Sequence, residues 1–69
     1  MTITQLKYVL AVAEHKNFTL AAEKCFVTQP TLSMQIQKIE EELGVQIFDR
    51  TKKPIQLTEI GLKIVNQSK

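Results

Sequence analysis

The most informative stretch of this chain runs from Thr28 to Gly44 and reads TQPTLSMQIQKIEEELG. It predicts a helix that ends at about Leu43. Thr28 is a suitable N-cap, and Pro30 falls in the first turn, where its missing N–H is not needed. Gly44 supplies the left-handed residue that commonly ends a helix. Apolar residues recur at helical spacing and predict the buried side of this helix, which comprises Leu32, Ile36, Ile39 and Leu43.

A first helix is expected N-terminal to this stretch, over residues 4 to about 15, with Thr4 as its N-cap. Its apolar positions follow the i, i+3, i+4, i+7 pattern of an amphipathic helix. They are Leu6, Val9, Leu10 and Ala13. The pair Lys16-Asn17 is expected to end this helix.

A short second helix is expected from Leu20 to Cys25, with Thr19 as its N-cap. Ala21 and Ala22 are small enough to let another helix approach closely. The connector Phe26-Val27 then leads directly into the helix that starts after Thr28. The sequence therefore predicts a helix-turn-helix arrangement.

Two β-prone runs follow Gly44, at residues 45–49 and 55–57. The five residues between them are Arg50-Thr51-Lys52-Lys53-Pro54, so the pattern predicts a hairpin with a basic tip, which is called the wing below. A last helix is expected to begin at Thr58, with Gly61 three residues later, and to be still running at Lys69. Its apolar positions are Ile60, Ile64 and Val65.

The fold class predicted by these elements is mainly α with a small β-hairpin: a winged helix-turn-helix with a three-helix core, a wing and the start of a further helix. Residues 1–57 would form this domain. Residues 58–69 would begin a helix with an unpartnered apolar side, which suggests that a longer parent protein continues past this point.

Composition limits the functions that the chain can have. Its 69 residues fit one small domain, and 43% hydrophobic with 23% charged residues is an ordinary globular mixture. No apolar stretch is long enough to span a membrane and no signal-peptide pattern is present, so we expect a cytoplasmic protein. With one cysteine, Cys25, and one histidine, His15, neither an internal disulfide nor a metal cluster is expected. We expect no enzyme activity and no cofactor.

The net charge of +2 is a weak argument for nucleic acid, but its distribution is informative. The wing and the C-terminal helix are basic, whereas the run from Glu40 to Glu42 lies at the end of the third helix. A carboxylate beside phosphate is repelled, so the N-terminal half of this helix is the part expected to enter a DNA groove.

The third helix would then present its polar side to the major groove of duplex DNA. We expect bases to be contacted by Gln29, Thr31, Ser33 and Met34, with Pro30 and Gln35 beside them. The DNA backbone would be contacted mainly by Thr28, Lys38, Arg50, Thr51, Lys52 and Lys53.

Other interpretations of the same residues remain open. A polar, capped, amphipathic helix is commonly only a solvated helix, a Lys-Lys-Pro turn can simply aid solubility, and no glycine occupies the connector. A winged-helix module that dimerises through its last helix and never binds DNA is the alternative from another functional class. An enzyme ranks below both, because the sequence offers no nucleophile, paired carboxylates or metal cluster.

Four segments together resemble the N-terminal domain of LysR-type transcriptional regulators of bacteria. They are Phe18-Thr19-x-Ala21-Ala22, Val27-Thr28-Gln29-Pro30-Thr31-Leu32-Ser33, Ile39-Glu40-x-Glu42-Leu43-Gly44-Val45-x-Ile47-Phe48-x-Arg50 and Leu57-Thr58-x-x-Gly61. Within the family, the stretch from Cys25 to Ser33 with Gln35-Ile36-x-Lys38 is similar to the peroxide-responsive OxyR branch.

The resemblance implies a homodimer that binds a two-fold operator, joined through a long linker helix that begins at Thr58. It also implies a separate effector-binding domain, which these residues do not include, and higher oligomers of the full-length protein. Family DNA contacts carry over to Thr28, Gln29, Pro30, Thr31, Ser33 and Met34 and to Arg50 with its neighbours. Many members have Arg at the position of Met34, so this chain departs from the family there.

The cysteines that sense peroxide in that branch belong to the effector domain. Cys25 is therefore expected to be a small core residue, and His15 a helix-terminal side chain favoured by the helix dipole. Phe18 and Phe48 are expected to pack in the core, whereas Phe26 in the connector is the one candidate for exposure.

Overall fold

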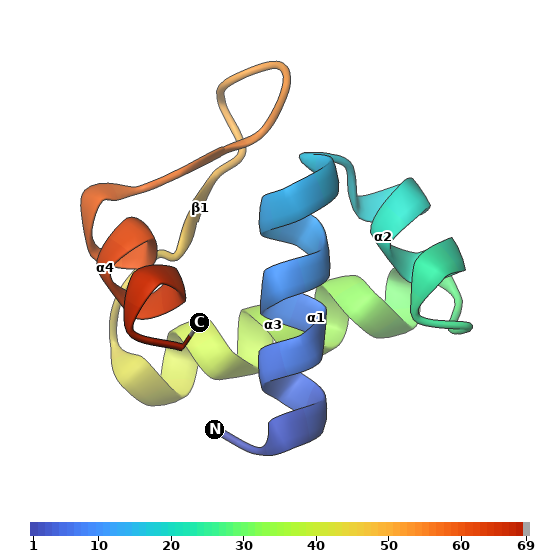
Figure 1. Cartoon of the computed structure of the whole chain (residues 1–69), viewed down its shortest axis with the longest axis horizontal. Helices are drawn as coiled ribbons and strands as arrows, with labels where there is room; N and C mark the ends of the chain where they lie inside the picture. Colours follow the sequence, from blue (N-terminus) through green and yellow to red (C-terminus); the bar gives the residue numbers. More distant parts are fainter. Residues whose placement is uncertain (69) are drawn as a thin grey trace.

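Over residues 1–68, which the computed structural model describes, the chain forms four helices and a two-stranded hairpin (Figure 1). In chain order the elements are α1 (Ile3–His15), α2 (Phe18–Lys24), α3 (Gln29–Leu43), β1 (Phe48–Asp49), β2 (Gln56–Leu57) and α4 (Glu59–Ser68). This confirms the predicted winged helix-turn-helix. Whether the last helix includes Lys69 lies outside the described residues.

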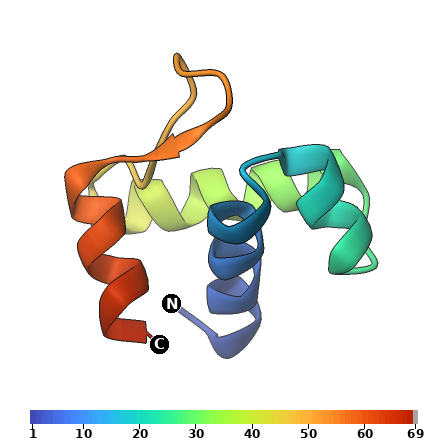
Figure 2. The same cartoon turned by 45° about the horizontal axis from the view of Figure 1, so that its top comes forward.

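The core lies where α1 packs across α3, with α2 on one side and α4 on the other (Figures 1 and 2). Ala21 and Ala22 are both buried, which agrees with their expected place between helices. Val12 is fully buried although the predicted apolar side of α1 did not include it. The buried apolar residues are Val9, Val12, Ala21, Ala22, Leu32, Ile36, Ile39, Ile47, Phe48 and Val65.

The predicted N-caps of the first two helices are wrong. Thr2, not Thr4, caps α1, because Gln5 completes a capping box in which each residue's side chain bonds the other's backbone N–H at 3.0 Å. Asn17, not Thr19, caps α2, and its side-chain oxygen accepts from the N–H of Leu20 at 2.9 Å. Both helices therefore start earlier than expected.

Two expected core residues are also more exposed than predicted. Leu43 is 45% exposed because the last turn of α3 extends beyond the residues that cover the core. Cys25 follows α2 as its C-cap and is half-buried, so it is not part of the buried cluster. His15 does lie in the last turn of α1, as expected.

The boundaries of α3 agree with the sequence. Thr28 precedes the first helical residue, Pro30 lies in the first turn, and Gly44 ends the helix with φ of 70°. Thr28 makes no side-chain hydrogen bond to the backbone of the first turn, however. Its hydroxyl instead bonds the hydroxyl of Thr31 at 2.9 Å.

The wing strands are shorter than the predicted runs. β1 and β2 pair antiparallel, with Phe48 opposite Leu57 and Asp49 opposite Gln56. The pairing ends at Ile47, whose carbonyl still accepts from the N–H of the opposite residue, Thr58, at 2.9 Å, because the N–H of Ile47 bonds the side chain of Glu40 on α3 instead of the other strand. The loop between the strands extends away from the body of the domain (Figure 2).

The start of α4 is fixed by Thr58 and Gly61. The hydroxyl oxygen of Thr58 accepts from the N–H of Gly61 at 3.0 Å, in the manner of an N-cap. Val65 is buried against the core, but Ile60 is 43% exposed, so the expected apolar side of this helix is only partly covered. Among the described residues, no helix is long and apolar enough to cross a membrane.

The turn between α2 and α3 contains an unfavourable residue. Phe26 has φ of 60°, a left-handed conformation that costs a residue with a Cβ about 1–2 kcal/mol. Its ring is 94% exposed, so little packing offsets this cost. A glycine, which many helix-turn-helix turns use, would adopt this conformation freely.

We therefore expect Phe26→Gly to stabilise the domain by about 0.5–1 kcal/mol, after allowing for the larger entropy of an unfolded glycine. Thermal unfolding followed by circular dichroism measures this change, and each kcal/mol should raise Tm by about 4–8 °C. Phe26→Ala is the control, because it removes the ring but keeps the Cβ, and it should leave Tm almost unchanged. A lower Tm for Phe26→Gly would contradict a strained turn.

Candidate nucleic-acid interface

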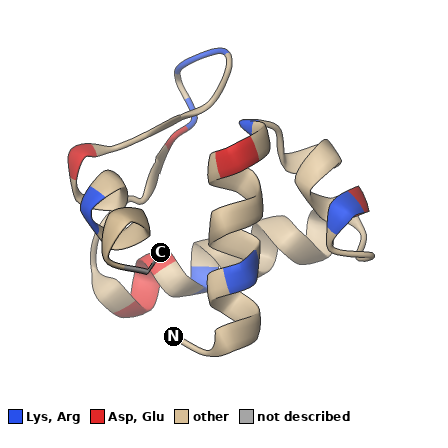
Figure 3. Cartoon of the chain, viewed as in Figure 1, with Lys and Arg blue, Asp and Glu red and all other residues tan. Residues whose placement is uncertain are grey.

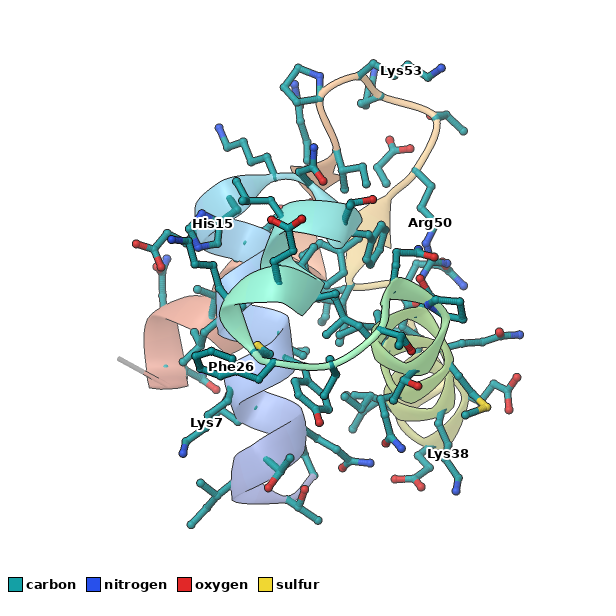
Figure 4. All side chains as sticks on the ribbon, turned by 90° about the vertical axis from the view of Figure 1, so that its right-hand side faces the viewer. Lys7, His15, Phe26, Lys38, Arg50 and Lys53 are labelled. Atoms are coloured by element: carbon teal, nitrogen blue, oxygen red, sulfur yellow. The ribbon has the colours of Figure 1, made fainter. Side chains whose placement is uncertain are left out.

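The N-terminal half of α3 presents an exposed surface on the side away from the core. Thr28, Pro30, Thr31 and Lys38 are exposed, and Met34 is 59% exposed. Figure 4 views this helix nearly end-on, with Lys38 pointing away from the body of the domain. The surface is therefore accessible to a partner as large as a DNA duplex.

Side chains on this surface are ordered by bonds along the helix. The amide nitrogen Nε2 of Gln29 donates to Oγ of Ser33 at 2.6 Å, and both residues are half-buried. Thr28 and Thr31 bond each other in the same way. Because Thr28 does not cap the first turn, the N–H groups there have no side-chain cap, and such groups favour an anion such as phosphate.

Gln35 has a different position from the other predicted contacts. It is half-buried, and its Oε1 accepts from Nε2 of Gln5 on α1 at 3.5 Å. This bond links α3 to α1. As a DNA contact Gln35 stays a prediction, and the structure adds this partner within the protein.

The wing and the C-terminal end of α3 carry opposite charges. Figure 3 shows acidic residues on the C-terminal part of α3 and basic residues on the wing loop. Glu41 and Glu42 are exposed, whereas Glu40 is only 4% exposed. A polyanion is consequently attracted to the wing and repelled from the last turns of α3.

The wing loop carries two exposed lysines, Lys52 and Lys53, and Lys53 extends from its tip (Figure 4). Thr51 donates to the carboxylate of Asp49 through both its hydroxyl and its backbone N–H. These two bonds, with a smaller contribution from Lys52, lower the pKa of Asp49 below its usual value. Asp49 therefore remains ionised near neutral pH and organises the start of the loop.

Arg50 lies at the base of the wing and points toward α3 (Figure 4). Its Nη2 is 3.3 Å from Oε1 of Glu40, and its guanidinium carbon lies 5.2 Å from the ring centroid of Phe18. The Phe18 ring also packs edge-on against Phe48, as expected for core aromatics. Arg50 is thus held by the protein, although its side chain is still 42% exposed.

A basic depression lies between the α1–α2 connector and the wing, with a volume of about 370 Å³. Its lining includes Lys16 and Thr19, which the sequence did not predict as contacts, because only the fold brings residues 16–19 next to the wing. The full lining is Lys16, Asn17, Phe18, Thr19, Arg50, Lys52, Lys53, Pro54 and Ile55.

The role of Glu40 was also missed in the sequence, although a signal was present. Glu40 follows Ile36 by four residues and so lies near the apolar side of α3. Considered only as a member of the acidic run, Glu40 was not predicted to point inward. Its carboxylate turns inward and bonds the chain that enters the wing.

A helix-turn-helix with an exposed polar second helix and a basic wing beside it defines a winged-helix domain of the kind that binds nucleic acid. The family model for bacterial regulatory helix-turn-helix proteins of the lysR family matches residues 3–62. The chain belongs to this LysR family, as the sequence motifs predicted.

Relatives with known roles match over the whole chain. The hydrogen peroxide-inducible genes activator of Pectobacterium carotovorum subsp. carotovorum is 48% identical over 69 residues, which are 100% of this chain and 23% of that protein. The DNA-binding transcriptional dual regulator OxyR of Escherichia coli strain K12 is 46% identical over the same shares. Both relatives are transcription regulators, and the chain spans about a quarter of their length.

Solved structures agree with the fold. The DNA-binding domain of BenM, solved in complex with benA site 1 DNA, has a TM-score of 0.95 and is 41% identical, covering 99% of this chain and 76% of that one. A full-length OxyR variant from Pseudomonas aeruginosa has a TM-score of 0.91 and is 48% identical, covering 99% and 23%. The similarity therefore includes a domain that was crystallised on DNA.

Proposed function

We propose that this chain binds duplex DNA sequence-specifically, with α3 in the major groove and the wing on the neighbouring backbone or minor groove. The observation that carries the proposal is the exposed polar surface at the start of α3 together with the exposed basic side chains of the wing. The complex of the similar BenM domain with DNA supports it.

The proposed roles follow from side-chain chemistry. Gln29, Thr31 and Ser33 offer donors and acceptors to base edges, and Met34 offers an apolar contact to a thymine methyl group. Pro30 lies beside them. Backbone phosphates are proposed to be contacted by Thr28, Lys38, Thr51, Lys52 and Lys53, together with Lys16 and Thr19 from the basic depression. Gln35 and Arg50 are proposed to contact DNA only in addition to their bonds within the protein.

We further propose that residues 1–57 form the DNA-binding unit and residues 58–69 begin a linker helix that joins two copies. A groove of about 440 Å³ between α1 and α4 supports this, since it is lined partly by apolar residues including Leu10, Leu57 and the half-exposed Leu62. A homodimer would place two copies of α3 on a two-fold operator. Higher oligomers are proposed for the longer protein.

The identity to peroxide-inducible activators supports a further proposal, that the longer protein regulates transcription in bacteria in response to hydrogen peroxide. Such sensing would reside outside these 69 residues. A DNA-binding regulator of a bacterial chromosome acts in the cytoplasm, which is the localisation we propose.

The test is selection from a random pool of DNA duplexes, followed by binding measurements across a salt series. We expect enrichment of a consensus and a steep loss of affinity with salt. Gln29→Ala should relax the consensus at one position, and Lys53→Ala should weaken all sequences and reduce the salt slope by about one. Lys7→Ala is the charge-matched control, because Lys7 lies on α1 far from Lys53 (Figure 4).

Absence of duplex binding at low salt would overturn the proposal. If the chain then still self-associates through α4, the protein-interaction module would replace it. Equal effects of Lys7→Ala and Lys53→Ala would indicate attraction by overall charge rather than a contact of the wing with DNA.

A further inference from the structure

Glu40 is the one charged side chain that is buried among the described residues. Its Oε2 accepts from the N–H of Ile47 at 2.7 Å and from the N–H of Phe48 at 3.2 Å. Its Oε1 faces Arg50 at 3.3 Å. A carboxylate removed from water needs such partners, so each of these contacts restricts where the partner residue can lie.

These partners all belong to the entry into the wing. Ile47 and Phe48 lead into and begin β1, and Arg50 follows directly after this strand. One side chain of α3 therefore holds three points along the first arm of the hairpin. The Phe18 ring, which contacts both Arg50 and Phe48, supports the same arm from α2.

The rest of the wing has fewer restraints. Each strand is only two residues long, and residues 50–55 form a loop that extends from the domain. A two-stranded ribbon this short has little stability of its own. The position of Lys52 and Lys53 relative to α3 therefore depends strongly on the contacts at its base.

We propose that Glu40 is a positioning residue for DNA binding, which holds the wing at a fixed place relative to the start of α3 through Arg50 and two backbone N–H groups. The proposal rests on the proposed function and deepens it, because α3 and the wing would then meet the DNA as one rigid surface. Glu40 does not itself touch DNA in this arrangement.

The sign of the charge effect makes the proposal testable. Removing a negative charge from a DNA-binding domain should by itself raise affinity. Glu41→Gln is the matched control, since Glu41 is the next residue of the same helix and is exposed, with its carboxylate accepting only a long 3.4 Å bond from Gln37. We expect this variant to bind the selected duplex as tightly as the unchanged chain or slightly more tightly.

Glu40→Gln should instead bind about tenfold more weakly, because the ionic partner of Arg50 is lost although an amide oxygen remains for the backbone. In this background, Lys53→Ala should cost much less affinity than it does in the unchanged chain, since a displaced wing no longer contributes. Arg50→Lys keeps the positive charge but loses the planar fork. Because Arg50 is itself a proposed DNA contact, its own loss of affinity is not the test; the test is that Lys53→Ala should also cost less in the Arg50→Lys background.

A measurement without DNA decides the same question independently. Nitrogen-15 relaxation of the amides of Thr51, Lys52, Lys53 and Ile55 should show increased mobility in Glu40→Gln and in Arg50→Lys, while α1 to α3 stay unchanged. Thermal unfolding identifies any variant that is not folded at the working temperature, and Arg50→Lys replaces Glu40→Gln in that case.

The proposal would be overturned if the wing amides of both Glu40→Gln and Arg50→Lys were as rigid as those of the unchanged chain. A Lys53→Ala effect of undiminished size would also overturn it. If the unchanged chain binds no duplex at all, the proposed function fails, but the relaxation comparison still tests whether Glu40 positions the wing.

Discussion

Met34→Glu should lower the affinity for the selected duplex at least about 100-fold at moderate salt, because a like charge placed against phosphate and base acceptors costs several kcal/mol. The domain itself should remain folded, since Met34 is 59% exposed and lies on the outer side of α3. Fluorescence anisotropy with a labelled duplex measures the affinity, and circular dichroism confirms the fold.

The control for this result is Leu43→Glu. Leu43 is also an exposed apolar residue of α3, so both variants change the net charge equally, but it lies at the far end of the helix. We expect its effect on affinity to be less than about fivefold. Equal losses would mean that overall charge alone governs binding, and normal binding by Met34→Glu would place the DNA elsewhere on the domain.

Gly61→Ala should destabilise the domain by about 3 kcal/mol or more, through overpacking against backbone that cannot easily move. A Cβ at this position would lie 2.1 Å from the carbonyl oxygen and 3.0 Å from the carbonyl carbon of Ile47. That carbonyl also accepts the N–H of Thr58, so a shift would disturb the start of α4. Urea unfolding followed by circular dichroism measures the loss.

Gly44→Ala provides a comparison that separates crowding from backbone conformation. Gly44 has φ of 70° but no atom within 4 Å of an added Cβ, so only the left-handed conformation is penalised, by about 1–2 kcal/mol. We expect Gly61→Ala to be clearly the more damaging change. The opposite order would show that α4 is not packed tightly on Ile47.

The sequence predicted α3 well because three independent signals agree there. Apolar spacing, Pro30 in the first turn and Gly44 at the end all give the same boundaries. The starts of α1 and α2 were predicted less well, since each offers two residues suited to capping only two positions apart, Thr2 and Thr4 for α1 and Asn17 and Thr19 for α2. A second bond, such as the one that the N–H of Thr2 donates to the side-chain oxygen of Gln5, selects between them.

The missed parts of the site depend on tertiary structure. Lys16 and Thr19 meet the wing only after folding, and nothing in their local pattern indicates it. Arg50 was predicted as a DNA contact from its type and position, but its pairing with Glu40, ten residues earlier in the sequence, depends on how the wing packs against α3. Local patterns define elements, whereas such contacts depend on how elements pack.

The close approach of Gly61 to Ile47 has a mechanical consequence. β2 ends at Leu57 and α4 begins at Glu59, so Thr58 alone separates them, and its N–H and hydroxyl are both bonded to the chain before β1. These bonds couple the start of α4 directly to the base of the wing. We therefore expect a rotation of α4 to be transmitted to the wing and α3 together, which would change the angle of the domain to the DNA axis more than its internal shape.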